Sequence, residues 1–129
     1  MANLVIVGAG MVYVGQISKV EQKDLSKRGA KNATIQWLID DEKGAKNFAM
    51  RRLVIKKNGF TPPMHRPHNW EHEVYVLSGK GIVRIGNKEF ALEKGNFVFI
   101  PPNVIHQFKN TSDKDFTFLC VIPLKGKWR

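Results

Sequence analysis

The chain has 129 residues, a formal net charge of +10 and 43% hydrophobic residues. This length predicts one domain, residues 1–129, and the composition is that of a globular protein rather than a disordered one. The single cysteine excludes an internal disulfide framework, and no apolar run is long enough to span a bilayer. Because the first residues lack the basic region of a secretory signal, we expect a cytoplasmic protein with no membrane partner.

Residues 1–20 predict an apolar β arm. Leu4–Val7 and Val12–Val14 are rich in β-forming residues, and Gly8–Gly10 predicts a bend between them. A dinucleotide-binding fingerprint would need a third glycine where Tyr13 stands, followed by a helix, so that interpretation is rejected. An exposed apolar edge promotes aggregation, and we therefore expect the arm to pair with another sheet edge.

Short strands are predicted at close spacing along the rest of the chain, after a polar loop or short helical turn over 21–32. Turn signals separate these strands, among them Asn58-Gly59 and Gly86-Asn87. The predicted strands are 34–39, 48–56, 73–77, 82–85, 88–92, 97–100, 105–109 and 116–122. Many short strands without an amphipathic helix predict an all-β fold, a sandwich or barrel of two antiparallel sheets.

The positive charge is spread along the chain rather than gathered. Its densest clusters are short: Arg51-Arg52, Lys56-Lys57 and the final Lys125, Lys127 and Arg129. No basic segment is interleaved with aromatic residues, and no nucleic-acid motif occurs, so we expect no nucleic-acid partner. The charge instead indicates a solvated basic surface or a preference for anionic small molecules.

All four histidines lie in two stretches of the chain. His65, His68 and His72 belong to 59–79, and His106 belongs to 95–110. Neutral imidazole is the commonest side-chain metal ligand, so this grouping indicates a metal site. A lone histidine in a basic protein is more often a surface or hydrogen-bonding residue, and for His65 that alternative stays open.

The first stretch resembles the first motif of the cupin superfamily. Five residues separate Gly59 from His65, and six separate His72 from Gly79, as that motif requires. Two features depart from it. His65 and His68 have two residues between them instead of one, so the loop must bulge for both to reach one ion. His72 stands where most cupins carry a glutamate, so the resemblance implies four imidazoles.

The second stretch resembles the second cupin motif. Gly95, Pro101, His106 and Asn110 keep its spacing, and Asn103 replaces its middle glycine. The chain is therefore identified as similar to small single-domain cupins with a four-histidine site. This resemblance implies a jelly-roll β-barrel, a homodimer and one divalent transition metal per chain. The implied ligands are His65, His68, His72 and His106.

Strand alternation predicts what else lines the interior, because every second side chain shares the face of a ligand. Arg51 and Arg52 are adjacent, so one points inward; we expect Arg51, which could anchor a carboxylate. Cys120 is either a small buried hydrophobe or an oxidisable group near the metal. The predicted lining residues are Arg51, Val74, Val76, Phe108, Phe118 and Cys120.

Function is less constrained than fold, because cupins carry out many kinds of chemistry. The first hypothesis is an oxygen-dependent, dioxygenase-like oxidoreductase that acts on a small organic molecule with manganese or iron; zinc, nickel or copper are the other candidate metals. The alternatives are a small-molecule binding or sensing cupin, and a metal-dependent isomerase or hydrolase without redox chemistry. The sequence predicts no catalytic residue beyond the metal ligands.

Overall fold

The computed structural model describes residues 3–8, 10–63 and 67–128. Its helices, within these ranges, are single 3-10 turns at Ile17–Lys19, Ser26–Arg28, Asp41–Lys43 and Leu124–Gly126. None of the described helices is long and apolar enough to cross a membrane. The strands are β1 (Asn3–Val7), β2 (Gly10–Val14), β3 (Lys23–Asp24), β4 (Lys31–Ile39), β5 (Phe48–Phe60), β6 (His72–Ser78), β7 (Lys80–Ile85), β8 (Lys88–Glu93), β9 (Phe97–Ile100), β10 (His106–Asn110) and β11 (Phe116–Pro123).

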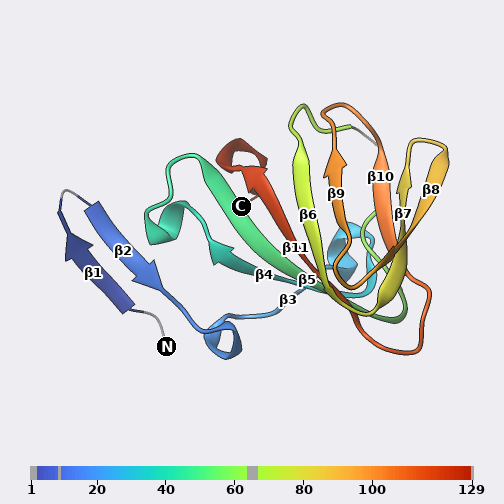
Figure 1. The fold of residues 1–129 in the computed structure, drawn as a ribbon, viewed down its shortest axis with the longest axis horizontal. Coiled ribbons are helices and arrows are strands. Elements are labelled where there is room, and N and C mark those ends of the chain that lie inside the picture. The colour runs from blue at the N-terminus through green and yellow to red at the C-terminus, as the bar shows by residue number, and fades with distance from the viewer. Residues whose placement is uncertain (1–2, 9, 64–66, 129) are drawn as a thin grey trace.

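Strands β3 to β11 form one antiparallel sheet that curls into a half-barrel (Figure 1). The strand order is β8-β7-β10-β5-β11-β6-β9, with β4 paired to β5 and β3 to β4. Strands β10 and β5 share a single register pair, Lys109 with Phe60, so two antiparallel layers meet at that point. The predicted all-β jelly-roll fold is confirmed.

The inner side of the curled sheet holds an aromatic and aliphatic core. On β11, Phe116, Phe118 and Ile122 are 0%, 1% and 0% exposed. The Phe118 ring also lies 4.4 Å from the Phe108 ring of β10, measured between centroids, which links the two layers. Because side chains alternate along a strand, the same packing places His72 and His106 on the inner side.

The predicted turn at Asn58-Gly59 is wrong, because β5 continues through both residues to Phe60. Asn58 has a φ of 63°, a left-handed conformation that asparagine tolerates better than most residues. A Cβ on Gly59 would lie 2.7 Å from the Lys31 carbonyl oxygen, so only glycine fits against that neighbour. Phe60, beyond them, still pairs with Lys31. Asn58 and Gly59 therefore form an irregularity inside the strand rather than a turn.

Strands β1 and β2 form a separate hairpin that extends away from the curled sheet (Figure 1). The predicted order of strand, bend and strand is therefore present. Val7, Met11 and Val14 of this hairpin are 61%, 57% and 56% exposed. The hairpin pairs with no sheet edge among the described residues of its own chain, which leaves its apolar side chains uncovered.

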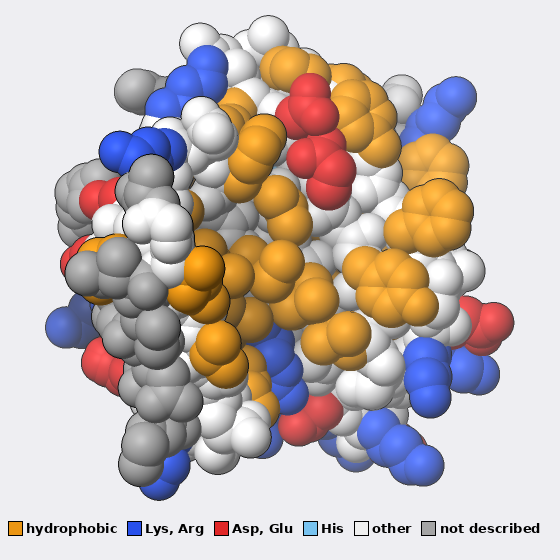
Figure 2. All heavy atoms as spheres, turned by 60° about the vertical axis from the view of Figure 1, so that its left-hand side comes forward, with side chains coloured by type: hydrophobic (Ala, Val, Ile, Leu, Met, Phe, Trp, Pro, Cys, Tyr) orange, Lys and Arg blue, Asp and Glu red, His pale blue; other side chains and the backbone are white. Residues whose placement is uncertain are grey.

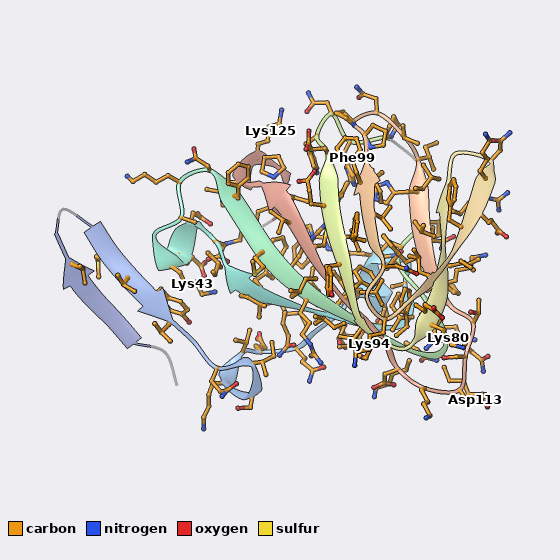
Figure 3. The ribbon with its side chains drawn as sticks, in the orientation of Figure 1. Lys43, Lys80, Lys94, Phe99, Asp113 and Lys125 are labelled. Atoms are coloured by element: carbon orange, nitrogen blue, oxygen red, sulfur yellow. The ribbon has the colours of Figure 1, made fainter. Side chains whose placement is uncertain are left out.

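Basic side chains lie around the periphery rather than on one surface. Lys80 and Lys94 lie close together and are exposed, whereas Lys43 lies in another part of the molecule and is partly buried (Figure 3). Some surface lysines face carboxylates, as Lys56 faces Asp115 at 3.6 Å. The large net charge is therefore dispersed, as the sequence indicates.

The turn between β6 and β7 should tolerate no side chain at Gly79. This residue has a φ of 80°, and a Cβ on it would overlap the Asp115 carbonyl oxygen. We expect Gly79→Ala to lower the free energy of unfolding by about 3 kcal/mol, from backbone strain and overlap together. Gly44 has a φ of 99° with no atom near its Cβ position, so Gly44→Ala should cost only about 1 kcal/mol. Urea unfolding measures both, and equal losses would contradict the role of the overlap.

Candidate metal centre

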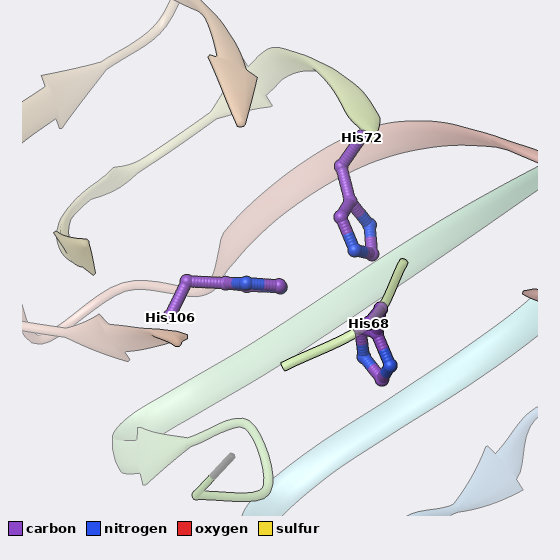
Figure 4. A group of neighbouring side chains, drawn as sticks. All are labelled: His68, His72 and His106. Carbon is purple, nitrogen blue, oxygen red and sulfur yellow. The ribbon is translucent and has the colours of Figure 1, made fainter. Parts of the chain in front are cut away.

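Three histidines from separate segments meet inside the half-barrel (Figure 4). His68 lies in the loop before β6, His72 begins β6 and His106 begins β10. Each offers one ring nitrogen, and these nitrogens all lie within 4.8 Å of one another. The fourth predicted ligand, His65, lies outside the described residues.

Backbone contacts bring these histidines together. The N–H of Asn103 donates a hydrogen bond to the carbonyl oxygen of His68, which joins the His68 loop to the turn before β10. Asn103 has a φ of 64°, and this left-handed conformation explains why the second motif has a glycine at the position. His72 is fixed from the other side by its register pairing with Ile100 of β9.

Asn110, the last residue of the second motif, has a structural role. Its amide nitrogen donates to the carbonyl oxygens of Ile55 and Lys114, at 2.8 and 2.7 Å. Its amide oxygen accepts a hydrogen bond from the Ser112 N–H. These contacts fix the turn after β10 against β5. The spacing from His106 to Asn110 therefore reflects the length of β10, not a role of Asn110 in metal binding.

Burial keeps the imidazoles neutral. His72 and His106 are 3% and 8% exposed, and desolvation lowers the pKa of His72 to about 2. Desolvation also lowers the pKa of His106 and that of His68, and the positive charge of Arg51 adds to each effect. Neutral imidazole is the form that binds a metal, so no proton has to be displaced near neutral pH.

The donor set fits a divalent transition ion. His72 Nε2 is buried without a hydrogen-bond partner, an arrangement that costs free energy unless something occupies the position. His106 Nδ1 lies 3.1 Å from the Val104 carbonyl oxygen, which can only accept, so Nδ1 carries the proton and Nε2 is free. The nitrogens, all within 4.8 Å of one another, are spaced on the scale of the roughly 4.2 Å that two imidazole nitrogens can span across one ion.

Arg51 and Cys120 lie beside His72. Arg51 Nη2 is 3.3 Å from His72 Nδ1 and 3.4 Å from Cys120 Sγ. When His72 Nε2 binds an ion, Nδ1 must carry the proton and can no longer accept from Arg51. Cys120 Sγ, 3.5 Å away, is then the acceptor within reach. The adjacent Arg52 faces the other side of the sheet, where it donates to Gln36 Oε1 at 2.8 Å.

The histidines open onto a cavity of about 290 Å³. Four of the predicted lining residues contribute to it: Arg51, Phe108, Phe118 and Cys120. Val74 and Val76 share the inward face of His72, but they are 3% and 0% exposed and pack in the hydrophobic core rather than lining the cavity.

Several further lining residues were not predicted, and among them are Arg28, Trp70 and Trp128. The Arg28 guanidinium lies 3.7 Å over the Trp128 ring, and the Trp70 ring stacks on His68 at 4.5 Å. These residues come from loops and from the C-terminal segment, where strand alternation assigns no direction. No aspartate or glutamate occurs among the described lining residues.

An antiparallel half-barrel with histidines at the starts of two inner strands defines a β-barrel protein with a candidate metal site. The family model of the cupin domain matches residues 51–122, more than half of the chain, and the chain belongs to this family. That match includes the three clustered histidines.

Two relatives are similar over most of the chain. The structure of the polyketide cyclase RemF from Streptomyces resistomycificus is 31% identical, with a TM-score of 0.78 over 86% of this chain and 78% of that chain. An oxalate-binding protein of Thermotoga maritima is 27% identical over 91% of this chain and 97% of the relative. Other curated relatives are matched only in part: a match of 57 residues covers 46% of an uncharacterized protein of Methanocaldococcus jannaschii, and the match to auxin-binding protein 1 of Arabidopsis thaliana covers 63% of that protein.

The neutral histidines should make the metal-free protein sensitive to acid. Above a pH of about 6.5 such a histidine is neutral in both the folded and the unfolded chain. Below that pH the unfolded chain binds a proton at the histidine and the folded chain does not, so the free energy of unfolding falls. At about pH 5 this costs roughly 2 kcal/mol for each histidine that stays neutral. Urea unfolding with a chelator, at about pH 7 and about pH 5, measures the loss.

His72→Gln is the matched variant. Between about pH 7 and about pH 5 its free energy of unfolding should fall less than that of the wild type, by the contribution of one histidine. Other titrating groups, such as the Glu73 carboxyl with its raised pKa, cancel in this comparison. Identical pH dependence in the two proteins would show that His72 takes up its proton in the folded state.

Proposed function

We propose that this cupin is a metal-dependent enzyme, an oxygen-dependent oxidoreductase that acts on a small organic molecule. The observation that carries the proposal is the composition of the cavity: neutral imidazoles, aromatic walls and no described carboxylate. Isomerases and hydrolases commonly move protons with a carboxylate near the reacting bond. The described lining has no such carboxylate, and this favours a reaction in which the metal ion supplies the chemistry.

The proposed ligands are His65, His68, His72 and His106. A manganese or iron(II) ion held by them would supply Lewis acidity and one-electron redox chemistry toward dioxygen. The imidazoles are neutral, so the chain leaves the full charge of the ion available to a bound substrate. Phe108 and Phe118 would exclude water from one side of the substrate, and Arg51 would hold a negative group beside His72.

A cyclisation catalyst is the second candidate, and one observation favours it. The relative named as a polyketide cyclase is 31% identical to this chain over most of its length. In such a reaction the ion would polarise a carbonyl group without changing its oxidation state, and zinc would serve as well as iron. The two candidates therefore differ in their need for oxygen and in the metals that support them.

Oxygen uptake separates these functions. We expect the manganese- or iron-loaded protein to consume oxygen with an electron-rich alkene, diketone or phenol, and the zinc-loaded protein to consume none. His72→Ala should lose more than about 100-fold in rate, beyond the effect typical of residues that only support a ligand. Conversion by the zinc form without oxygen would favour cyclisation. Binding without turnover for every metal would leave a small-molecule binding protein.

We also propose a homodimer, because two apolar surfaces lack a cover. The first is the β1–β2 hairpin. The second is the outer side of β6 and the edge strand β9, where Tyr75, Phe97 and Phe99 are 49%, 80% and 57% exposed. Hydrophobic side chains gather over one face of the molecule (Figure 2). The hairpin of one copy would cover the outer sheet face of the other, and burial of both surfaces would drive association.

Removal of residues 1–15 tests this assembly. We expect the full chain to be a dimer and the truncated chain to be a monomer or an aggregate, because the sheet face loses its cover. A Phe97→Ser, Phe99→Ser double variant should dissociate the dimer while keeping the hairpin. Sedimentation velocity gives the mass of each species. A stable monomer before and after truncation would contradict the proposal.

A further inference from the structure

The charge of the cavity is one-sided. Arg51 lines its interior and Arg28 its exposed rim, and no described lining residue is acidic. Neither arginine forms an ion pair with a carboxylate in the described part of the chain. A divalent ion at the histidines would add to this positive charge rather than offset it. Charge enclosed without an anionic partner, as at Arg51, is costly, so the cavity favours a ligand that brings negative charge.

Unused hydrogen-bond donors indicate where that charge belongs. Arg51 Nε and Trp70 Nε1 are buried without an acceptor, and both residues line the cavity. The hydrogen-bond contacts that Arg51 does make are long, at 3.3 Å to His72 Nδ1 and 3.4 Å to Cys120 Sγ, and its guanidinium lies 5.5 Å from the centroid of the Trp37 ring. Buried donors are nearly always paired in folded proteins. A guanidinium group suits the two oxygens of a carboxylate, which accept parallel hydrogen bonds.

The other walls suit an aromatic group of limited size. Phe108 and Phe118 form a tilted pair with centroids 4.4 Å apart, and Trp70 and Trp128 also line the cavity. The volume of about 290 Å³ lies at the low end of ligand pockets, which range from about 300 to 1,000 Å³. One or two rings fit such a space, whereas a short aliphatic acid would leave the aromatic walls uncovered.

We infer that this cavity binds a small aromatic carboxylate, with the carboxylate against Arg51 and the ring against Phe108 and Phe118. The inference rests on the proposed function, because it names the ligand class of the same site. Arg51 sets the charge of the ligand, and the aromatic walls set its shape.

Three probes test the two parts of this ligand class. Benzoate carries both the charge and the ring, benzamide is its neutral counterpart, and acetate has the charge without the ring. Calorimetry on the zinc-loaded full chain should show benzoate binding at least about ten-fold more tightly than either of the others. Equal binding of benzamide would overturn the anionic part, and equal binding of acetate would overturn the aromatic part.

Variants of Arg51 test the residue itself. Arg51→Met should weaken benzoate by about ten- to a hundred-fold, the usual range for a hydrogen bond to a charged group, and leave benzamide nearly unchanged. Arg51→Lys should keep the preference for benzoate. Arg84→Met is the matched control, because Arg84 is exposed on β7 and outside the cavity, and it should bind as the wild type does.

Two controls keep the result decisive. Benzoate must remain preferred over benzamide after zinc is removed, because Arg51 persists; loss of the preference would assign it to the metal and overturn the inference. Circular dichroism checks that each variant folds. If Arg51→Met does not fold, wild type and Arg51→Lys carry the test with the same probes, and equal binding of benzamide and benzoate by both would overturn the inference.

The experiments distinguish a wrong ligand class from a wrong proposed function. Benzoate preference without oxygen uptake would keep the ligand class and refute the oxygen-dependent enzyme. Oxygen-dependent turnover of a neutral substrate, with benzamide bound as tightly as benzoate, would keep the enzyme and refute the ligand class.

Discussion

The burial of His72 and His106 as neutral rings is the constraint on which the site depends. Each begins an inner strand, where the fold leaves almost no surface to water. A charged imidazole would lose its hydration there, and the neighbouring Arg51 guanidinium opposes a second positive charge. The rings are therefore held as neutral bases, and a bound metal ion would supply the interaction that His72 Nε2 lacks.

The scaffold positions the histidines largely through backbone contacts. Strand pairing places His72 opposite Ile100, and the Asn103 N–H connects the His68 loop to the turn before β10. The aromatic core, with Phe118 between Phe108 and Phe116, packs the inner face of the strands that carry His72 and His106. Paired strands and a close-packed core thus bring together histidines from two separate motifs.

Alternation and turn signals were sufficient to predict most of the strands, because their inner faces are buried and several of their turns contain glycine. Prediction failed at Asn58-Gly59, where tertiary pairing of Phe60 extends β5 through a local turn signal. It also missed Arg28 and Trp128, because a residue in a loop or near a chain end has no periodic partner to show its direction. The positions of His72 and His106 follow from strand parity, whereas that of His68 depends on a loop contact.

The exchange of one motif residue links the metal site to the proposed ligand. His72 stands where the first cupin motif usually has a glutamate, so the site has one negative charge fewer than that motif provides. Arg51 beside it adds a positive charge, and no described lining carboxylate offsets either the guanidinium or a bound ion. A charge that the chain does not provide must come from solvent ions or from the ligand. Because aromatic side chains line the same cavity and restrict its water, an organic anion matches the site better than a hydrated one.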